Sequence, residues 1–402
     1  MREMKDSGNK WIGLIPKTWG VERIKTIFSE RSELSEDGSE TLLSVSEYYG
    51  VANRAEKVED GEYVSRAESL VGYKKCYKGD LVSNIMLAWK GSMGVTELDG
   101  IVSPAYCVYK PSKSVYPRYY HYLFRTSLYT SIFRLYSKGI IDSRLRLYSP
   151  YFFDIKAIIP SLAEQQKIAE FLDRKCAEVD EMIGLQEQII EELKAYKQSV
   201  ITEAVTKGLN PDAPMRDSGI EWIGQTPEHW EVTRLKFYAS IDSGDAISNE
   251  KISEEGDYPV YGGGDIMGYY SDYNTTEDKL IIGRVGARCG CVTMLKQRCW
   301  ASDNALVLKS ALPLKYTYHL LQAIDLNRLN TSNAQPLITA TKVKNVFIPL
   351  TPLAEQQAIA DYLDEKCADI DSLIQTKQEK IDSLKEYKKS IIYEYVTGKK
   401  EV

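Results

Sequence analysis

The sequence has no long hydrophobic run. No apolar stretch reaches the ~18 residues that a membrane-spanning helix needs. Residues 1–6, Met-Arg-Glu-Met-Lys-Asp, lack the apolar core of a secretion signal. We therefore expect a cytoplasmic protein.

Cysteine and histidine are both scarce. Seven cysteines are an odd number, and Cys289, Cys291 and Cys299 lie at spacings that fit no common zinc pattern. Three histidines give poor support for a His-based triad or a metal cluster. We expect no bound metal.

Phosphate-binding motifs are also missing. Residues 398–400, Gly-Lys-Lys, lack the upstream glycine and the hydroxyl of a P-loop. Residues 262–264 are three glycines, but no helix is predicted after them, as a dinucleotide-binding fingerprint requires. The sequence therefore predicts a chain without a catalytic site.

A long internal repeat is present instead. Residues 162–206 begin Leu-Ala-Glu-Gln-Gln, and a shift of 191 residues aligns them without a gap to residues 353–397. In both copies apolar residues recur at alternating steps of about four and three, which is the seam of a coiled coil. The seam residues are Leu172, Val179, Ile183, Ile190 and Leu193 in the first copy, and Leu363, Ile370, Ile374, Ile381 and Leu384 in the second. We expect two long helices that pack antiparallel, with a hairpin in a larger bundle as the alternative.

A second motif is also duplicated. Residues 4–25 and 215–236 share an Asp-Ser-Gly, a Trp-Ile-Gly, a proline and a second tryptophan, but here the shift is 211 rather than 191. The linker at 207–214 contains a glycine and two prolines, which end a helix. The chain is therefore a tandem duplication, with four predicted domains: 1–160 (first domain of mixed pattern), 161–207 (first long helix), 208–349 (linker and second domain of mixed pattern) and 350–402 (second long helix).

The regions between these motifs have a mixed pattern. Short strands joined by turns are predicted at 81–84, 91–95, 101–108, 280–284, 286–292 and 301–307. A Tyr-rich helix follows in each half, at 119–136 and at about 316–329. The predicted fold class is α+β: two α/β domains separated by two long antiparallel coiled-coil helices, related by a pseudo-two-fold.

The net charge of -6 hides an uneven distribution. Residues 110–156 hold nine Lys and Arg against two Asp, and residues 279–350 hold ten against two. Two separate basic segments favour two contacts with a polyanion, although solvated loops are the alternative. Cationic and aromatic side chains in these segments, and near them in the first half, are candidates for contacts with phosphates and bases. The candidates are Trp89, Lys90, Lys138, Arg144, Arg146, Arg284, Arg288, Lys342 and Lys344.

The two Trp-Ile-Gly motifs, the two Leu-Ala-Glu-Gln-Gln helix starts and the two unlike regions between them resemble the specificity subunit of type I restriction-modification systems, the HsdS family. The resemblance covers essentially the whole chain. It implies that residues around 20–160 and 231–350 are target recognition domains, each reading one half of a split double-stranded DNA sequence. It also implies that the helices bind two methyltransferase subunits, which carry S-adenosylmethionine, while this chain binds no cofactor.

The resemblance leaves open whether restriction (nuclease/translocase) subunits join that complex. Two alternatives to a non-catalytic specificity subunit also remain. One is a self-contained DNA-modifying enzyme with unfamiliar motifs, and the other is a coiled-coil scaffold without a DNA role.

Overall fold

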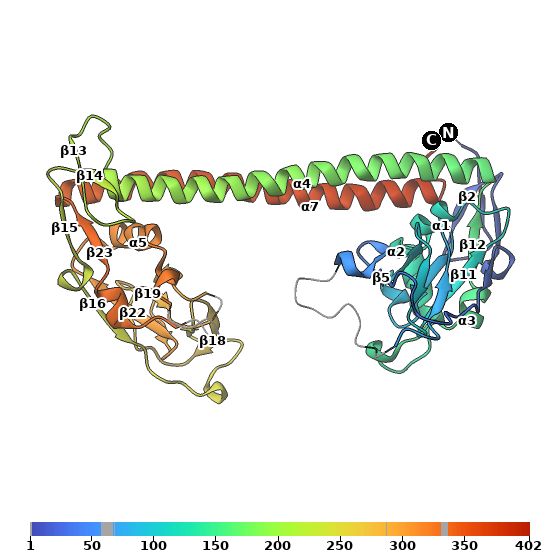
Figure 1. The fold of residues 1–402 in the computed structure, drawn as a ribbon, viewed down its shortest axis with the longest axis horizontal. Coiled ribbons are helices and arrows are strands. Elements are labelled where there is room, and N and C mark those ends of the chain that lie inside the picture. Colours follow the sequence, from blue (N-terminus) through green and yellow to red (C-terminus); the bar gives the residue numbers. More distant parts are fainter. Residues whose placement is uncertain (1, 58–66, 68, 287, 331–336) are drawn as a thin grey trace. The chain divides into compact units, whose positions relative to one another are not determined.

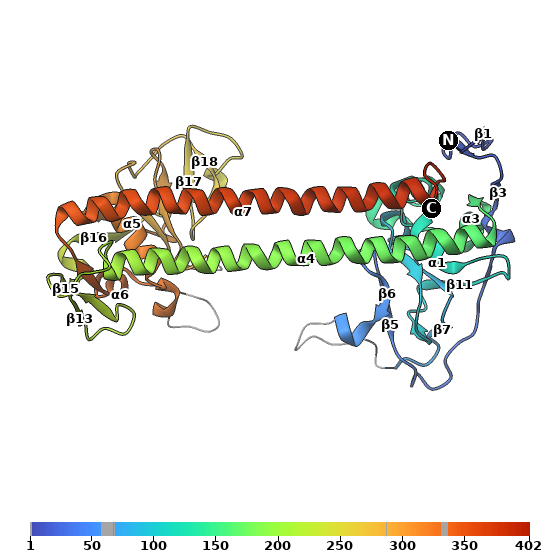
Figure 2. The same ribbon diagram turned by 90° about the horizontal axis from the view of Figure 1, so that it is seen from above.

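Two long helices dominate the fold. The computed structural model describes residues 2–57, 67, 69–286, 288–330 and 337–402. Helix α4 (Leu162–Lys207) has 46 residues and helix α7 (Leu353–Val396) has 44, and the two lie next to each other (Figures 1 and 2). Neither contains a proline, and Gly184 is the only glycine, so nothing in either sequence stops the helix.

The two helices pack antiparallel. In the first half of α4, Asp180 forms an ion pair with Lys388 in the second half of α7, with 2.6 Å between Oδ2 and Nζ. Near the end of α4, Lys197 forms an ion pair of 2.7 Å with Asp371. The shift of 191 residues converts one pair into the other, so the same antiparallel packing occurs twice.

The chain forms two compact units. One comprises residues 1–185 and 380–402, and the other comprises residues 186–379. We call residues 2–161 the N-terminal lobe and residues 208–352 the C-terminal lobe. Each unit contains one lobe and one end of both long helices. The predicted α+β class and the tandem duplication are confirmed.

The predicted seam is buried most deeply where a lobe covers it. Leu172 lies in the core of the N-terminal lobe, and Leu363 lies in the core of the C-terminal lobe. Val179, Ile190, Ile370, Ile381 and Leu384 are also buried. Ile183, Leu193 and Ile374 are only half-buried, because two helices alone cannot enclose an apolar stripe.

Both lobes contain a four-stranded antiparallel sheet of the same order. The strands of the N-terminal lobe are β4 (Phe28–Glu30), β11 (Tyr106–Pro111), β8 (Leu81–Asn84) and β9 (Met93–Val95), in that order. Those of the C-terminal lobe are β16 (Ala239–Ser243), β22 (Ala305–Ser310), β19 (Leu280–Gly283) and β20 (Val292–Met294). The duplication therefore extends to the regions whose sequences differ most.

Shorter strand pairs complete each lobe. In the N-terminal lobe they are β1 (Met4–Asp6) with β2 (Leu14–Pro16), β3 (Gly20–Arg23) with β12 (Lys156–Ile159), β5 (Leu43–Ser46) with β6 (Gly50–Asn53), and β7 (Lys74–Cys76) with β10 (Gly100–Val102). In the C-terminal lobe they are β13 (Met215–Asp217) with β14 (Gln225–Pro227), β15 (Glu231–Arg234) with β23 (Phe347–Leu350), and β17 (Tyr258–Tyr261) with β18 (Ile266–Tyr270) and β21 (Trp300–Ala301).

The helices of the lobes are shorter than the sequence pattern predicts. The helix expected at 119–136 is two helices, α1 (Pro117–Leu123) and α2 (Ser127–Tyr136), because the Thr126 side chain accepts a hydrogen bond from the Tyr129 amide and caps α2. The second expected helix is α5 (Leu314–Ala323), followed by a 3₁₀ turn at Leu326–Leu329. Two further short α-helices of the lobes are α3 (Ser149–Asp154) and α6 (Ala340–Lys344).

One aspartate on each long helix holds the nearby helix of the lobe. Asp173 on α4 accepts hydrogen bonds from Arg118 (2.7 Å) and Tyr122 (2.6 Å) of α1. The aspartate 191 residues later, Asp364 on α7, binds Lys315 and His319 of α5 at 2.6 and 2.8 Å. The position is kept, whereas its partners differ.

The two duplicated motifs meet at the ends of the long helices. Trp19 Nε1 donates a hydrogen bond to Glu164 Oε1 (3.1 Å) at the start of α4, and Trp230 Nε1 donates one to Glu355 Oε2 (2.9 Å) at the start of α7. Both indoles are buried. Each also lies against a glycine with positive φ after the other long helix. A Cβ at Gly398 would lie 2.9 Å from the Trp19 ring, and one at Gly208 would lie 3.1 Å from the Trp230 ring. We call each of these arrangements a tryptophan clasp.

The Glu164 carboxylate of the first clasp has a lowered pKa. Partial burial alone would raise the pKa of Glu164, but hydrogen bonds from Trp19, Ser161 and Arg2 outweigh this effect and lower the pKa to about 2. Its usual value is 4.5. Because the folded pKa is depressed, the carboxylate contributes stability above pH 4.5, and this contribution is lost as the pH falls towards 2.

We therefore expect Glu164→Gln to melt about 2 to 4 °C below the wild type at pH 7, since a hydrogen bond to a charged group is lost. The difference should shrink as the pH falls from 4.5 towards 2. Calorimetry at a series of pH values measures it. Glu181→Gln, at an exposed position of α4, is the control and should match the wild type. A difference between Glu164→Gln and the wild type that does not change with pH would contradict this role.

Candidate nucleic-acid interface

The described residues contain no group of three or more His, Cys, Asp and Glu side chains placed to hold a metal ion. Within the same residues, no helix has the length and apolar character to cross a membrane. The candidate interface consists of basic and aromatic side chains on turns and loops of the two lobes and on the short helix α6.

Trp89 and Lys90 follow the strand β8 in the N-terminal lobe. They lie in a 3₁₀ turn, Ala88–Lys90, which Gly91 ends with a φ of 90°. Trp89 Nε1 donates to the Met86 carbonyl (3.1 Å), which fixes the indole. The guanidinium of Arg134 lies 4.9 Å from the centre of the ring, and the Lys90 ammonium lies 5.3 Å from it.

The loop at 138–146 lies beside this turn. Its ends are joined by two backbone hydrogen bonds of 2.9 Å between Lys138 and Arg146. The same Arg134 that contacts Trp89 also binds both carboxylate oxygens of Asp142, at 2.7 and 2.9 Å. Arg146 Nη1 donates to two carbonyls of its own loop, at 2.8 and 3.2 Å. The loop is therefore braced internally and tied to α2.

A cavity of about 560 Å³ lies between the turn and the loop. It is lined by Met86, Leu87, Trp89, Lys90, Asp142, Ser143 and Arg146. The structure thus brings together Trp89, Lys90 and Arg146, while Lys138 and Arg144 lie on the same loop. Lys138 places its ammonium 4.6 Å from the centre of the Tyr151 ring. Their assignment as DNA contacts stays a prediction.

The four candidates of the C-terminal lobe are less concentrated. Arg284 donates to Ser243 Oγ (3.2 Å) and to the Asp303 carbonyl (3.1 Å), and Arg288 forms an ion pair with Asp265 at 3.1 Å. Lys342 lies elsewhere in the lobe. It donates to the Leu329 carbonyl (2.8 Å) and lines a cavity of about 420 Å³ with Arg328 and Asn330, among others.

Lys344, the last of the four, lies 3.8 Å from Asp242. The C-terminal candidates therefore do not share one cavity, and each has a partner within its own lobe. In the segment 330–344, which carries Lys342 and Lys344, residues 331–336 lie outside the described residues.

A residue that the sequence did not single out, Arg125, joins two turns of the N-terminal candidate interface. Arg125 donates hydrogen bonds to the carbonyls of Ser46, Glu47 and Tyr48 in the β5–β6 turn, and to those of Gly91 and Met93, at 2.7 to 3.4 Å. Burial lowers the pKa of this guanidinium, and the charge of Arg118 lowers it further. The turn that it fixes carries Tyr48, whose side chain is 85% exposed. No sequence signal separates Arg125 from the other basic residues of its segment.

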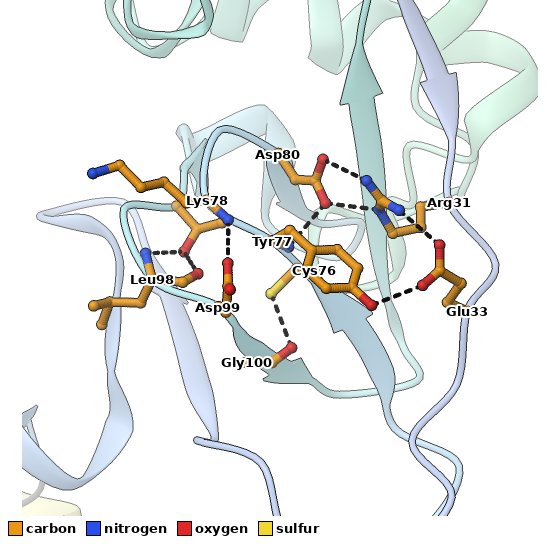
Figure 3. Close-up of polar contacts among 10 residues, drawn as sticks. Arg31, Glu33, Cys76, Tyr77, Lys78, Asp80, Leu98, Asp99 and Gly100 are labelled. Carbon is orange, nitrogen blue, oxygen red and sulfur yellow. Dashed lines mark hydrogen bonds and ion pairs between the residues drawn. The ribbon is translucent and has the colours of Figure 1, made fainter.

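A buried ion pair holds β4 next to the turn that precedes β8. Arg31 binds Asp80 through Nε (2.8 Å) and Nη2 (3.2 Å), and a third nitrogen binds Glu33 at 2.7 Å (Figure 3). Burial raises the pKa of the neighbouring Cys76 thiol to about 12, so this cysteine stays protonated. The C-terminal lobe has Lys279 before β19, in place of an aspartate. The two lobes thus share a fold without sharing this chemistry.

The long helices expose apolar side chains away from their seam. Met182 and Leu373 are 42% and 50% exposed, and they occupy equivalent positions of the repeat. Tyr196 and Tyr387 form a second equivalent pair, at 58% and 52% exposed. Because the ion pair Asp180–Lys388 sets the register, Met182 and Tyr387 lie at the same level of the helix pair. Leu373 and Tyr196 do so in the other unit.

Comparison with known proteins identifies a family. The model of the type I restriction modification DNA specificity domain matches residues 16–195 and again residues 227–386. The type I restriction enzyme EcoprrI specificity subunit of Escherichia coli is 30% identical over 138 residues, which is 34% of each chain. The StySPI specificity subunit of Salmonella potsdam is 24% identical over 90% of this chain and 84% of its own length.

The fold is also found among solved structures. A chain in a structure that addresses complex assembly and conformational transition of the type I R-M system superposes with a TM-score of 0.72 at 18% identity. The match covers 96% of this chain and 99% of that one.

Arg125 provides a test of the interface scaffold. Arg125→Lys keeps the charge but cannot reach five carbonyls, so we expect a loss of about 2 to 3 kcal/mol of stability in the N-terminal lobe. The melting temperature should decrease, and hydrogen–deuterium exchange should become faster at residues 46–50. Arg174→Lys, at an exposed position of α4, is the matched control. Unchanged exchange at the turn would show that Arg125 does not hold it.

Proposed function

Because the chain belongs to the type I restriction modification DNA specificity family, we propose that its two lobes each read one half of a split double-stranded DNA sequence. One observation carries this proposal. The sheets β4-β11-β8-β9 and β16-β22-β19-β20 have the same order, yet the side chains beside them differ. Two lobes with one fold and unlike contact residues suit two different half-sites, because base identity is read by individual side chains.

The character of the candidate contacts supports DNA as the ligand. In the N-terminal lobe, Trp89, Lys90 and Arg146 line one cavity, and Arg144 is exposed beside it. In the C-terminal lobe, Arg328 and Lys342 line the other. Arg and Lys bind phosphates and guanine edges, while the aromatic ring offers a surface for stacking or for contact with a thymine methyl group.

We further propose that the long helices bind two methyltransferase subunits. The exposed pairs Met182/Tyr387 and Leu373/Tyr196 support this assignment, since apolar and aromatic side chains are enriched at protein interfaces. In this proposal the chain performs no chemical step and works in the cytoplasm. S-adenosylmethionine and the flipped adenine belong to the partner, and restriction subunits join only if the complex also cuts DNA.

The central test exchanges one recognition region. Residues 24–158, which begin directly after β3 and end within its partner strand β12, are replaced by the same region of another family member. Methylome sequencing of cells that express the chimera with its methyltransferase should show one new half-site, with the other half unchanged. The reciprocal exchange in the C-terminal lobe should change the other half. An unaltered methylation pattern would refute the proposal.

Replacing an exposed apolar residue of each pair with glutamate tests whether these pairs bind the methyltransferase subunits. Because hot-spot residues contribute about 2 kcal/mol or more, we expect Met182→Glu to weaken one methyltransferase site by at least about tenfold. Met182→Glu combined with Leu373→Glu should weaken both sites. Titration calorimetry should report a dissociation constant that is raised at one of the two sites in the single variant and at both sites in the double variant. Ala177→Glu and Ala368→Glu, at exposed and equivalent positions, are the controls. Two intact sites in the double variant would place docking elsewhere.

A further inference from the structure

The tip of the loop at 138–146 carries two exposed isoleucines. Ile140 is completely exposed, and the next residue, Ile141, is 53% exposed. Single apolar residues on a surface are common and need no explanation. Two adjacent isoleucines at the tip of a projecting loop do need one, because exposed β-branched apolar side chains contribute nothing to stability.

This tip is held in one conformation. The two backbone hydrogen bonds between Lys138 and Arg146 close the loop, and Leu145 is buried beneath it. Arg134 fixes Asp142 from α2, through both carboxylate oxygens. A preorganised loop loses little conformational freedom when it binds. Little of the binding free energy of an apolar contact at its tip is therefore offset by the entropy cost of ordering the loop.

The surroundings of the tip are basic. Lys138 and Arg144 are in the same loop, and Lys90 lies across the cavity that the loop lines. The one carboxylate within the loop, Asp142, is bound by Arg134. An apolar tip surrounded by cations matches a polyanion that also offers an apolar group, which is the chemistry of duplex DNA.

Duplex DNA offers such a group in its major groove. That groove admits a two-stranded ribbon, and the 5-methyl group of thymine is the apolar feature that its base pairs present there. An isoleucine side chain has no hydrogen-bonding group, so it can read a base edge only through apolar contact. Resting on the proposed function, we propose that Ile140 contacts the 5-methyl group of a thymine in the half-site that the N-terminal lobe reads.

The test uses the full chain in complex with its methyltransferase. Methylome sequencing gives the target, and each thymine of that half-site is replaced in turn by uracil, which removes only the methyl group. We expect wild-type affinity to fall about five- to tenfold at one position. Ile140→Ala should bind the thymine duplex less tightly by a similar factor, and it should no longer distinguish thymine from uracil.

Two controls make the result decisive. Leu135→Ala, at another exposed apolar position, should keep the thymine preference, and uracil in the other half-site should affect wild type and Ile140→Ala equally. The proposal is overturned if the half-site contains no thymine, if wild type ignores uracil, or if Ile140→Ala keeps the preference. In those cases the exchange of residues 24–158 still changes half of the target if the proposed function is right, so the two ideas fail separately.

Discussion

The hydrogen bond between an indole and a carboxylate at the start of each long helix is the contact on which the rest of the structure depends. Trp19 and Glu164 join the first motif to α4, and Trp230 and Glu355 join the second to α7. Each indole also packs against the glycine after the opposite helix, so a single ring fixes two helix ends. Substitution of either partner therefore affects a lobe and both helices together. This arrangement explains why the two duplicated motifs occur together in each half.

The tryptophan clasps and the aspartates at 173 and 364 form a constant frame. The candidate contact surfaces take no part in these contacts, so their side chains can differ between the two lobes. The buried pair Arg31–Asp80 has no counterpart before β19, where Lys279 stands. A frame that is held at the helix ends lets contact residues change without loss of the fold. A protein of the DNA specificity family benefits from this separation, because new recognition requires new side chains and not new architecture.

Sequence patterns predicted the parts of the fold that local order determines. The repeat shift of 191 residues and the seam spacing gave both long helices, and apolar runs located strands such as Leu81–Asn84 and Leu280–Gly283. The break at Thr126 was missed, because one hydroxyl cap ends a pattern that otherwise reads as a continuous helix. The candidate site was predicted only as a set of residue types. The partners of Arg125 are five carbonyls that lie 32 to 79 residues away in the sequence, and no local pattern reveals them.

The composition of the two units has a consequence for synthesis. The unit with the C-terminal lobe is one continuous stretch, residues 186–379, whereas the unit with the N-terminal lobe needs residues 380–402. Val396 lies in the core of the N-terminal lobe, and its carbonyl accepts a hydrogen bond of 2.7 Å from the Tyr119 hydroxyl. On the ribosome, the lobe that is made first is therefore completed last. A chain without residues 380–402 therefore leaves that core open, even though every residue of the lobe itself is present.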